Sequence, residues 1–137
     1  MRNPIHRALV ASLAGVVLVL GGTTALQAQQ ANEIKRTLLL KHDASIAGHD
    51  GVVSTTLIPK GASEVRHTHP GDLLGYVLSG TLTLEIDGQP AATVKPGEAF
   101  FIPAEKVHRG VNKGGEAIHI VAVLYVEKGK PLAPPAP

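Results

Sequence analysis

The most informative stretch of this chain reads GASEVRHTH, residues 61–69, and contains two histidines two positions apart. In a β-strand, residues two positions apart point to the same side. His67 and His69 can therefore face one ion together, and a third histidine, His108, stands in the stretch PAEKVHRGVN at residues 103–112. Because neutral imidazole is the commonest protein metal ligand, the three histidines together predict a metal site.

Short apolar runs that end at Gly, Pro, Asp or Asn follow one another through most of the chain. Residues 81–86 alternate strictly between polar and apolar side chains and stop at an Asp-Gly pair, which is a strong hairpin signal. This alternation predicts that Leu82, Leu84 and Ile86 face a core. Residues 118–126 are the longest strand candidate, and no segment beyond the N-terminal region has a convincing helical period. The pattern predicts an all-β sandwich or barrel.

The first part of the chain has the residue order of a secretory signal peptide. Arg2 and Arg7 form a basic start, residues 8–20 are apolar or small with one serine, and small residues up to Ala28 offer a cleavage point. We expect residues 1–28 to direct Sec-type export in a bacterium, to the periplasm or the medium. The alternative is an uncleaved membrane anchor. The sequence has no cysteine, which excludes disulfides, thiolate metal ligands and a lipid-modified cysteine anchor.

The charge balance depends on that export segment. The whole chain carries 13 Lys and Arg against 11 Asp and Glu, so removal of Arg2 and Arg7 leaves 11 against 11. A neutral mature chain gives no reason to expect nucleic acid or, after cleavage, a membrane surface as a partner. We expect a linker at residues 29–36, one β-barrel domain at residues 37–126 and a Pro-rich extended tail at residues 127–137.

These residues resemble a family, the cupins, which carry two short motifs on a small β-barrel. The first cupin motif reads G-x5-H-x-H-x3-E-x6-G. Gly61, His67, His69 and Gly80 stand at its glycine and histidine positions. Leu73 stands where the motif has its glutamate. The first motif therefore matches except at the glutamate position, which is a metal ligand in the family.

The second cupin motif reads G-x5-P-x-G-x2-H-x3-N. Gly97, Pro103, His108 and Asn112 match it, and Glu105 replaces the middle glycine. Asn112 is expected to serve packing or turn geometry rather than the metal. The resemblance covers nearly the whole mature chain. It implies a small single-domain cupin, an all-β double-stranded β-helix or jelly-roll barrel preceded by the signal segment.

The replacement of the motif glutamate by Leu73 changes the expected metal. Cupins with this motif usually bind their ion through three histidines and one carboxylate, so the resemblance implies a site of His67, His69 and His108 without an anionic ligand. Such a site disfavours Mn²⁺ and favours Fe, Zn, Cu or Ni, which accept imidazole well. A three-histidine centre with open positions is competent for catalysis in principle, as the zinc of carbonic anhydrase illustrates.

Three other side chains are alternative participants. Asp72 lies one residue from the motif position, and a shift of one residue points a side chain to the opposite face of a strand. Glu105 lies on the approach to His108, where a solvent-facing role is favoured over that of a metal ligand on a rearranged loop or of an acid or base. His119 lies in the last strand candidate and is a weaker candidate for a replacement ligand or for a partner of a ligand.

The leading interpretation is an exported cupin that binds a divalent transition metal through three histidines and a small organic ligand in the barrel. As an enzyme it would be a metal-dependent dioxygenase or isomerase, a choice that rests on analogy between folds. The alternative is a non-catalytic periplasmic ligand- or metal-binding cupin with a degenerate site, which the missing glutamate favours. No catalytic residue is assigned beyond the metal ligands, and the family resemblance also allows a homodimer.

Overall fold

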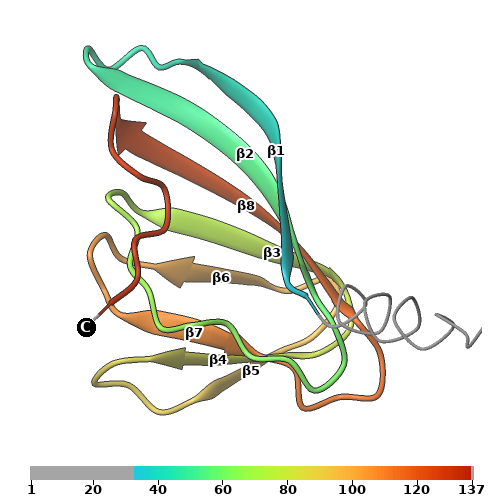
Figure 1. Ribbon diagram of the computed structural model, residues 1–137. Helices are drawn as coiled ribbons and strands as arrows, with labels where there is room; N and C mark the ends of the chain where they lie inside the picture. Colours follow the sequence, from blue (N-terminus) through green and yellow to red (C-terminus); the bar gives the residue numbers. More distant parts are fainter. Residues whose placement is uncertain (1–32, 137) are drawn as a thin grey trace, which may run out of the picture.

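Two antiparallel β-sheets face each other in the computed structural model, which describes residues 33–136 (Figure 1). The five-stranded sheet has the order β1-β2-β8-β3-β6, and the three-stranded sheet has the order β5-β4-β7. The strands are β1 (Lys35–Asp43), β2 (His49–Ile58), β3 (Leu73–Ser79), β4 (Leu82–Ile86), β5 (Ala92–Val94), β6 (Ala99–Ile102), β7 (His108–Val111) and β8 (Ile118–Glu127). The predicted all-β jelly-roll fold is confirmed.

The signal peptide predicted at residues 1–28 lies outside the described residues. Export therefore stays a prediction from sequence. Within residues 33–136, no helix is long and apolar enough to cross a membrane.

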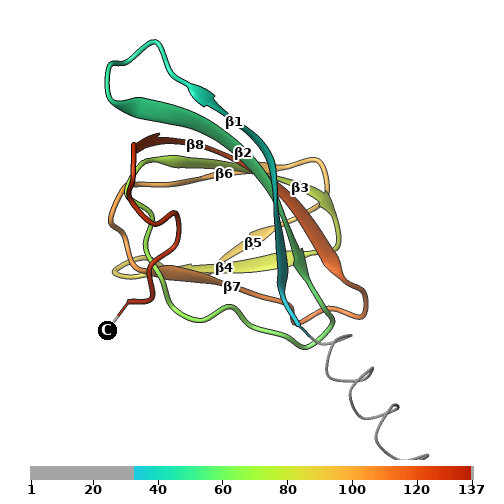
Figure 2. The same ribbon diagram turned by 45° about the horizontal axis from the view of Figure 1, so that its top comes forward.

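The core lies between the two sheets, and strand alternation decides which side chains enter it. In β4, Leu82, Leu84 and Ile86 are buried, as their spacing predicted. In β8, Ile118 and Ile120 begin a series of buried side chains at every second position. Figure 2 shows the sheets as opposite walls of a barrel. The barrel interior is therefore lined by alternate residues from both sheets.

The chain after β8 turns back and runs beside the segment that carries His67 and His69 (Figures 1 and 2). The carbonyl oxygen of Pro134 accepts a hydrogen bond of 3.1 Å from the Thr68 N–H. Leu132 packs against the core cluster. The sequence predicted an extended tail here, and the structure adds that this tail lies against the barrel rather than away from it.

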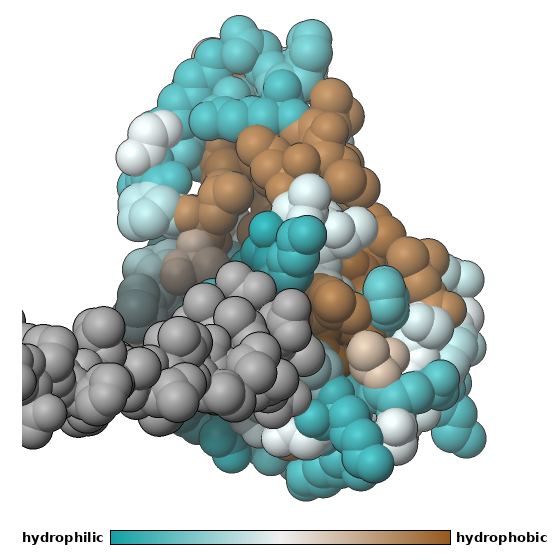
Figure 3. All heavy atoms as spheres, turned by 45° about the vertical axis from the view of Figure 1, so that its right-hand side comes forward, coloured by the Kyte–Doolittle hydropathy of each residue, from teal (hydrophilic) through white to brown (hydrophobic). Residues whose placement is uncertain are grey.

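Apolar side chains also lie on the outer face of the five-stranded sheet. Leu74, Tyr76 and Leu78 are exposed at alternate positions of β3, and the exposed Phe101 of β6 pairs with Leu74. Figure 3 shows a band of apolar residues between hydrophilic regions on the face that it presents. A homodimer stays a prediction.

Candidate metal centre

Two backbone hydrogen bonds join His67 to His108. The His67 N–H donates to the His108 carbonyl oxygen at 3.1 Å, and the His108 N–H donates to the His67 carbonyl oxygen at 3.0 Å. Residues paired in this antiparallel way point to the same side. His69 follows two positions after His67, and the centroids of the three buried rings are 4.3 to 4.9 Å apart. The structure thus brings together the three histidines that the sequence singled out.

The main chain decides which nitrogen of each ring carries the proton. The acceptors are the carbonyl oxygens of Val65, Leu132 and Lys106, which lie 2.8, 2.6 and 2.8 Å from Nδ1 of His67, His69 and His108, respectively. A carbonyl oxygen can only accept, so each Nδ1 donates, and in the neutral form of each ring Nε2 carries the lone pair. One ring nitrogen from each histidine lies within 4.8 Å of the others. This donor set fits a divalent metal that accepts imidazole.

Burial keeps two of the rings in the neutral form that binds metals. Desolvation lowers the pKa of His69 to about 4, although its hydrogen bond to the Leu132 carbonyl acts in the opposite direction. Desolvation also lowers the pKa of His108, against the effect of the Lys106 carbonyl. At neutral pH both imidazoles are therefore uncharged, and a metal ion need not displace a proton from either ring.

The three histidines lie in the wall of a cavity of about 260 Å³ between the sheets. Most of the remaining wall is apolar and includes Leu73, Leu84, Phe100, Ile120 and Leu132. A cavity of this size suits a small organic molecule, because pockets for drug-sized ligands start near 300 Å³. The polar residues of the wall that could orient such a molecule are the three histidines, Glu64 and residues of β1 and β2, namely Arg36, Thr37, Ser54 and Thr56.

Leu73 occupies the position of the motif glutamate and faces the cavity. It is the first residue of β3, pairs with Ile102 and Leu124, and is 6% exposed. The neighbouring Asp72 is exposed, and its carboxylate accepts a hydrogen bond of 2.9 Å from the Ala104 N–H. The expectation that Asp72 points away from the site is confirmed. Replacement of the glutamate therefore leaves an apolar wall beside the histidines.

The other two alternatives also lie outside the cavity wall. Glu105 is exposed, with a positive φ of 61°, and its N–H donates to the His69 carbonyl oxygen at 2.8 Å. His119 is exposed on the outer face of β8. Asn112 is buried, and its Nδ2 lies within 3.0 Å of three backbone carbonyl oxygens. Asn112 thus fixes the chain around β7, as expected, and does not face the histidines.

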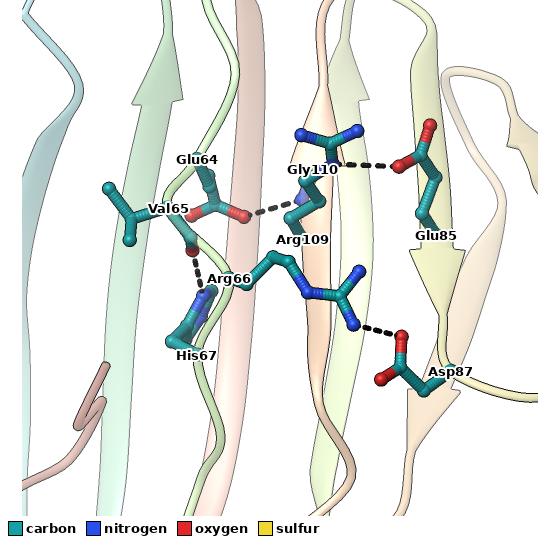
Figure 4. Close-up of polar contacts among 8 residues, drawn as sticks. All are labelled: Glu64, Val65, Arg66, His67, Glu85, Asp87, Arg109 and Gly110. Atoms are coloured by element: carbon teal, nitrogen blue, oxygen red, sulfur yellow. Dashed lines mark hydrogen bonds and ion pairs between the residues drawn. The ribbon is translucent and has the colours of Figure 1, made fainter. Parts of the chain in front are cut away.

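Sequence reasoning missed two charged residues in the cavity wall. The Glu64 side chain, 10% exposed, forms an ion pair with Arg36 of β1. The Oε2 atom of Glu64 accepts a hydrogen bond of 2.8 Å from the N–H of Gly110 in β7. Figure 4 shows the carboxylate directed at β7. Glu64 lies inside the spacer of the first motif, where no residue type is specified. No local pattern therefore distinguished it from a surface residue.

A family model described as a cupin domain matches residues 54–129, which is more than half of the chain. The protein therefore belongs to the cupin domain family, as the two motifs predicted. Among proteins with curated functions, none matches the chain significantly.

Many solved structures share this fold. The polyketide cyclase RemF from Streptomyces resistomycificus is 26% identical, with a TM-score of 0.60 over 77% of this chain and 72% of that one. A cupin superfamily protein from Desulfitobacterium hafniense is 20% identical, with a TM-score of 0.59 over 70% of this chain and 80% of that one. KdgF from Halomonas sp. is 24% identical, with a TM-score of 0.54 over 66% of this chain and 77% of that one.

Proposed function

We propose that this cupin binds a divalent transition metal through Nε2 of His67, His69 and His108 and admits a small organic ligand to the adjoining cavity. The observation that carries the proposal is the set of Nδ1 bonds to main-chain carbonyls, which leaves three lone pairs within one small space. Buried imidazoles without this arrangement would be ordinary core residues. Three neutral ligands favour Fe, Zn, Cu or Ni over Mn.

The proposed activity is that of a metal-dependent isomerase or dioxygenase on a ligand that coordinates through oxygen. When bound, the metal supplies Lewis-acid polarisation of a ligand oxygen and, in the case of iron or copper, redox chemistry. The protein holds the three rings in one tautomer, and the apolar wall with Leu73 excludes water from the ligand. The likeness to a polyketide cyclase at 26% identity favours an activity in which the metal polarises a carbonyl group over one that uses redox chemistry.

A non-catalytic binding protein is the second candidate, and Leu73 is the observation that favours it. Without the motif carboxylate, the three proposed ligands bring no negative charge, which weakens metal affinity. A protein that only captures a ligand needs no acid or base beside it. We propose the periplasm or the medium as the place of action in either case, on the strength of the sequence of residues 1–28.

Metal analysis of the purified protein tests the proposal. We expect close to one equivalent of iron, zinc, copper or nickel by mass spectrometry after isolation or reconstitution. A His67→Ala/His108→Ala variant should lose the metal, and His119→Ala, which changes an exposed histidine, should retain it. A wild-type protein that stays free of metal after reconstitution with all four would contradict the metal centre.

A second experiment separates the enzyme from the binding protein. Oxygen uptake with thiols or diketones would support the dioxygenase, and proton exchange in a ketone ligand would support the isomerase. Ligand binding in calorimetry without turnover by either assay would favour the non-catalytic alternative. For export, cell fractionation and the N-terminal sequence of the purified protein should show cleavage between Ala25 and Ala28.

A further inference from the structure

Glu64 brings a carboxylate into a cavity whose proposed metal ligands are neutral. Within residues 33–136 it is the only Asp or Glu in the cavity wall, and Arg36 is the only Lys or Arg. The Glu64 side chain is 10% exposed and the Arg36 side chain 45%. A divalent ion at the histidines would therefore meet one well-buried negative charge, which a more solvated positive charge partly offsets.

The position of the Glu64 carboxylate follows from Gly110. Gly110 and His108 are two residues apart in β7, so they belong to the same face of the strand. A Cβ built on Gly110 would lie 2.9 Å from Oε2 of Glu64. The carboxylate thus fills the place of a side chain at position 110, beside His108 and about 7 Å along the strand.

Each carboxylate oxygen already has a partner. Oε2 accepts from the Gly110 N–H, and Oε1 pairs with Arg36. The backbone N–H of Glu64 also donates to the Gly110 carbonyl oxygen at 2.9 Å. The side chain therefore completes the pairing of its own segment with β7. It does not belong to the group of residues whose ligand atoms all lie within 4.8 Å of one another, so it acts as a nearby charge rather than as a metal ligand.

Both charges lie in the same cavity wall as the histidines. The Glu64 carboxylate is bonded to the Gly110 N–H, two residues from His108, and Arg36 lines the same cavity. Because the cavity is a medium of low dielectric constant, both charges influence a cation held by the rings.

We propose that Glu64 supplies, from outside the coordination sphere, the negative charge that Leu73 does not provide, and that Arg36 limits its effect. This inference rests on the proposed metal centre and adds a residue that tunes its affinity. Removal of the negative charge weakens metal binding, and removal of the positive charge strengthens it. If the Glu64–Arg36 ion pair served only the structure, its two variants would not change metal affinity in opposite directions.

The test is a titration of Co²⁺ into the metal-free full-length protein, followed by the visible absorption of the bound ion. Glu64→Gln keeps a side-chain oxygen for the Gly110 N–H and removes the negative charge together with its ion pair to Arg36. We expect it to weaken Co²⁺ binding about tenfold, the lower end for outer-shell partners. Arg36→Met should tighten binding about threefold, because an opposing charge is lost.

Glu85→Gln is the matched control. Glu85 pairs with Arg109, the neighbour of Gly110 in β7, at 2.7 Å (Figure 4). Neither residue of this pair lines the cavity. We expect its Co²⁺ affinity to equal that of the wild type. Thermal unfolding without metal should show that Glu64→Gln remains folded. If it does not, the opposite change in Arg36→Met alone decides the inference.

The outcomes separate this inference from the proposed function. A wild-type protein that binds neither Co²⁺ nor iron, zinc, copper or nickel contradicts the metal centre and the inference together. A wild-type protein that binds Co²⁺, with Glu64→Gln and Arg36→Met of equal affinity to it, contradicts only the role of Glu64. Equal weakening in Glu64→Gln and Glu85→Gln would assign the effect to general surface charge and also overturn the inference.

Discussion

The carbonyl oxygen of Leu132 lies 2.6 Å from Nδ1 of His69, although 63 residues separate the two in the chain. The C-terminal tail therefore determines the tautomer of a proposed metal ligand. His67 and His108 find their acceptors two residues away in their own segments. Only His69 depends on a distant part of the molecule, so the tail contributes to the site and does not merely cover it.

Removal of the tail should weaken the metal centre. A chain that ends at Lys130 lacks the Leu132 carbonyl, and the His69 ring is then free to rotate and to change tautomer. We expect metal affinity to fall about tenfold, as measured by Co²⁺ titration. Leu132→Ala is the control, because it removes the apolar contact with the core and keeps the carbonyl. Equal loss in both variants would show that packing, not the hydrogen bond, holds His69.

Leu73→Glu should tighten metal binding, because the side chain at position 73 faces the cavity beside the histidines. We expect an affinity gain of about tenfold, together with a lower melting temperature without metal, since a carboxylate is then buried without a partner. Leu74→Glu, at an exposed position of the same strand, should change neither quantity. Unchanged affinity in Leu73→Glu would show that residue 73 does not reach the ion.

The metal-free protein should lose stability as the pH falls through the range of the histidines. The folded-state pKa of His69 is about 4, below the ordinary 6.5. Between these values the unfolded chain binds a proton that the folded chain does not, so the free energy of unfolding falls as the pH falls from about 6.5 to 4. The loss for His69 is about 3 kcal/mol. Urea unfolding across this range measures it, and a His69→Gln variant should show a shallower slope.

Gly71 admits no side chain where the chain passes from His69 to β3. A Cβ at this position would lie 2.0 Å from the carbonyl oxygen of Tyr125 in β8. Gly71→Ala should therefore lower the free energy of unfolding by about 3 kcal/mol, the upper end for overpacking. Gly115→Ala, where a Cβ meets nothing within 4 Å, should lower it far less. Chemical denaturation of both variants compares them, and similar losses would contradict the steric explanation.

The features that could be predicted from sequence are those that short-range spacing determines. The period of two in residues 81–86 predicted the buried face of β4, and the same rule turned Asp72 away from the site. The contacts of Glu64 and Leu132 were not predictable in this way. Arg36 reaches Glu64 across 28 residues and Leu132 reaches His69 across 63. Such contacts depend on the path of the whole chain, and local sequence patterns contain no information about that path.

The three Nδ1 acceptors are backbone carbonyl groups, and this has a consequence for how the protein can vary. A side-chain acceptor disappears with a single codon change, but a carbonyl oxygen remains at Val65, Lys106 or Leu132 whatever amino acid is encoded there. The ring orientation is thus insulated from most point mutations in these acceptors. Substitutions in the cavity wall can therefore change the ligand preference while each of the three imidazoles keeps the same nitrogen pointing inward.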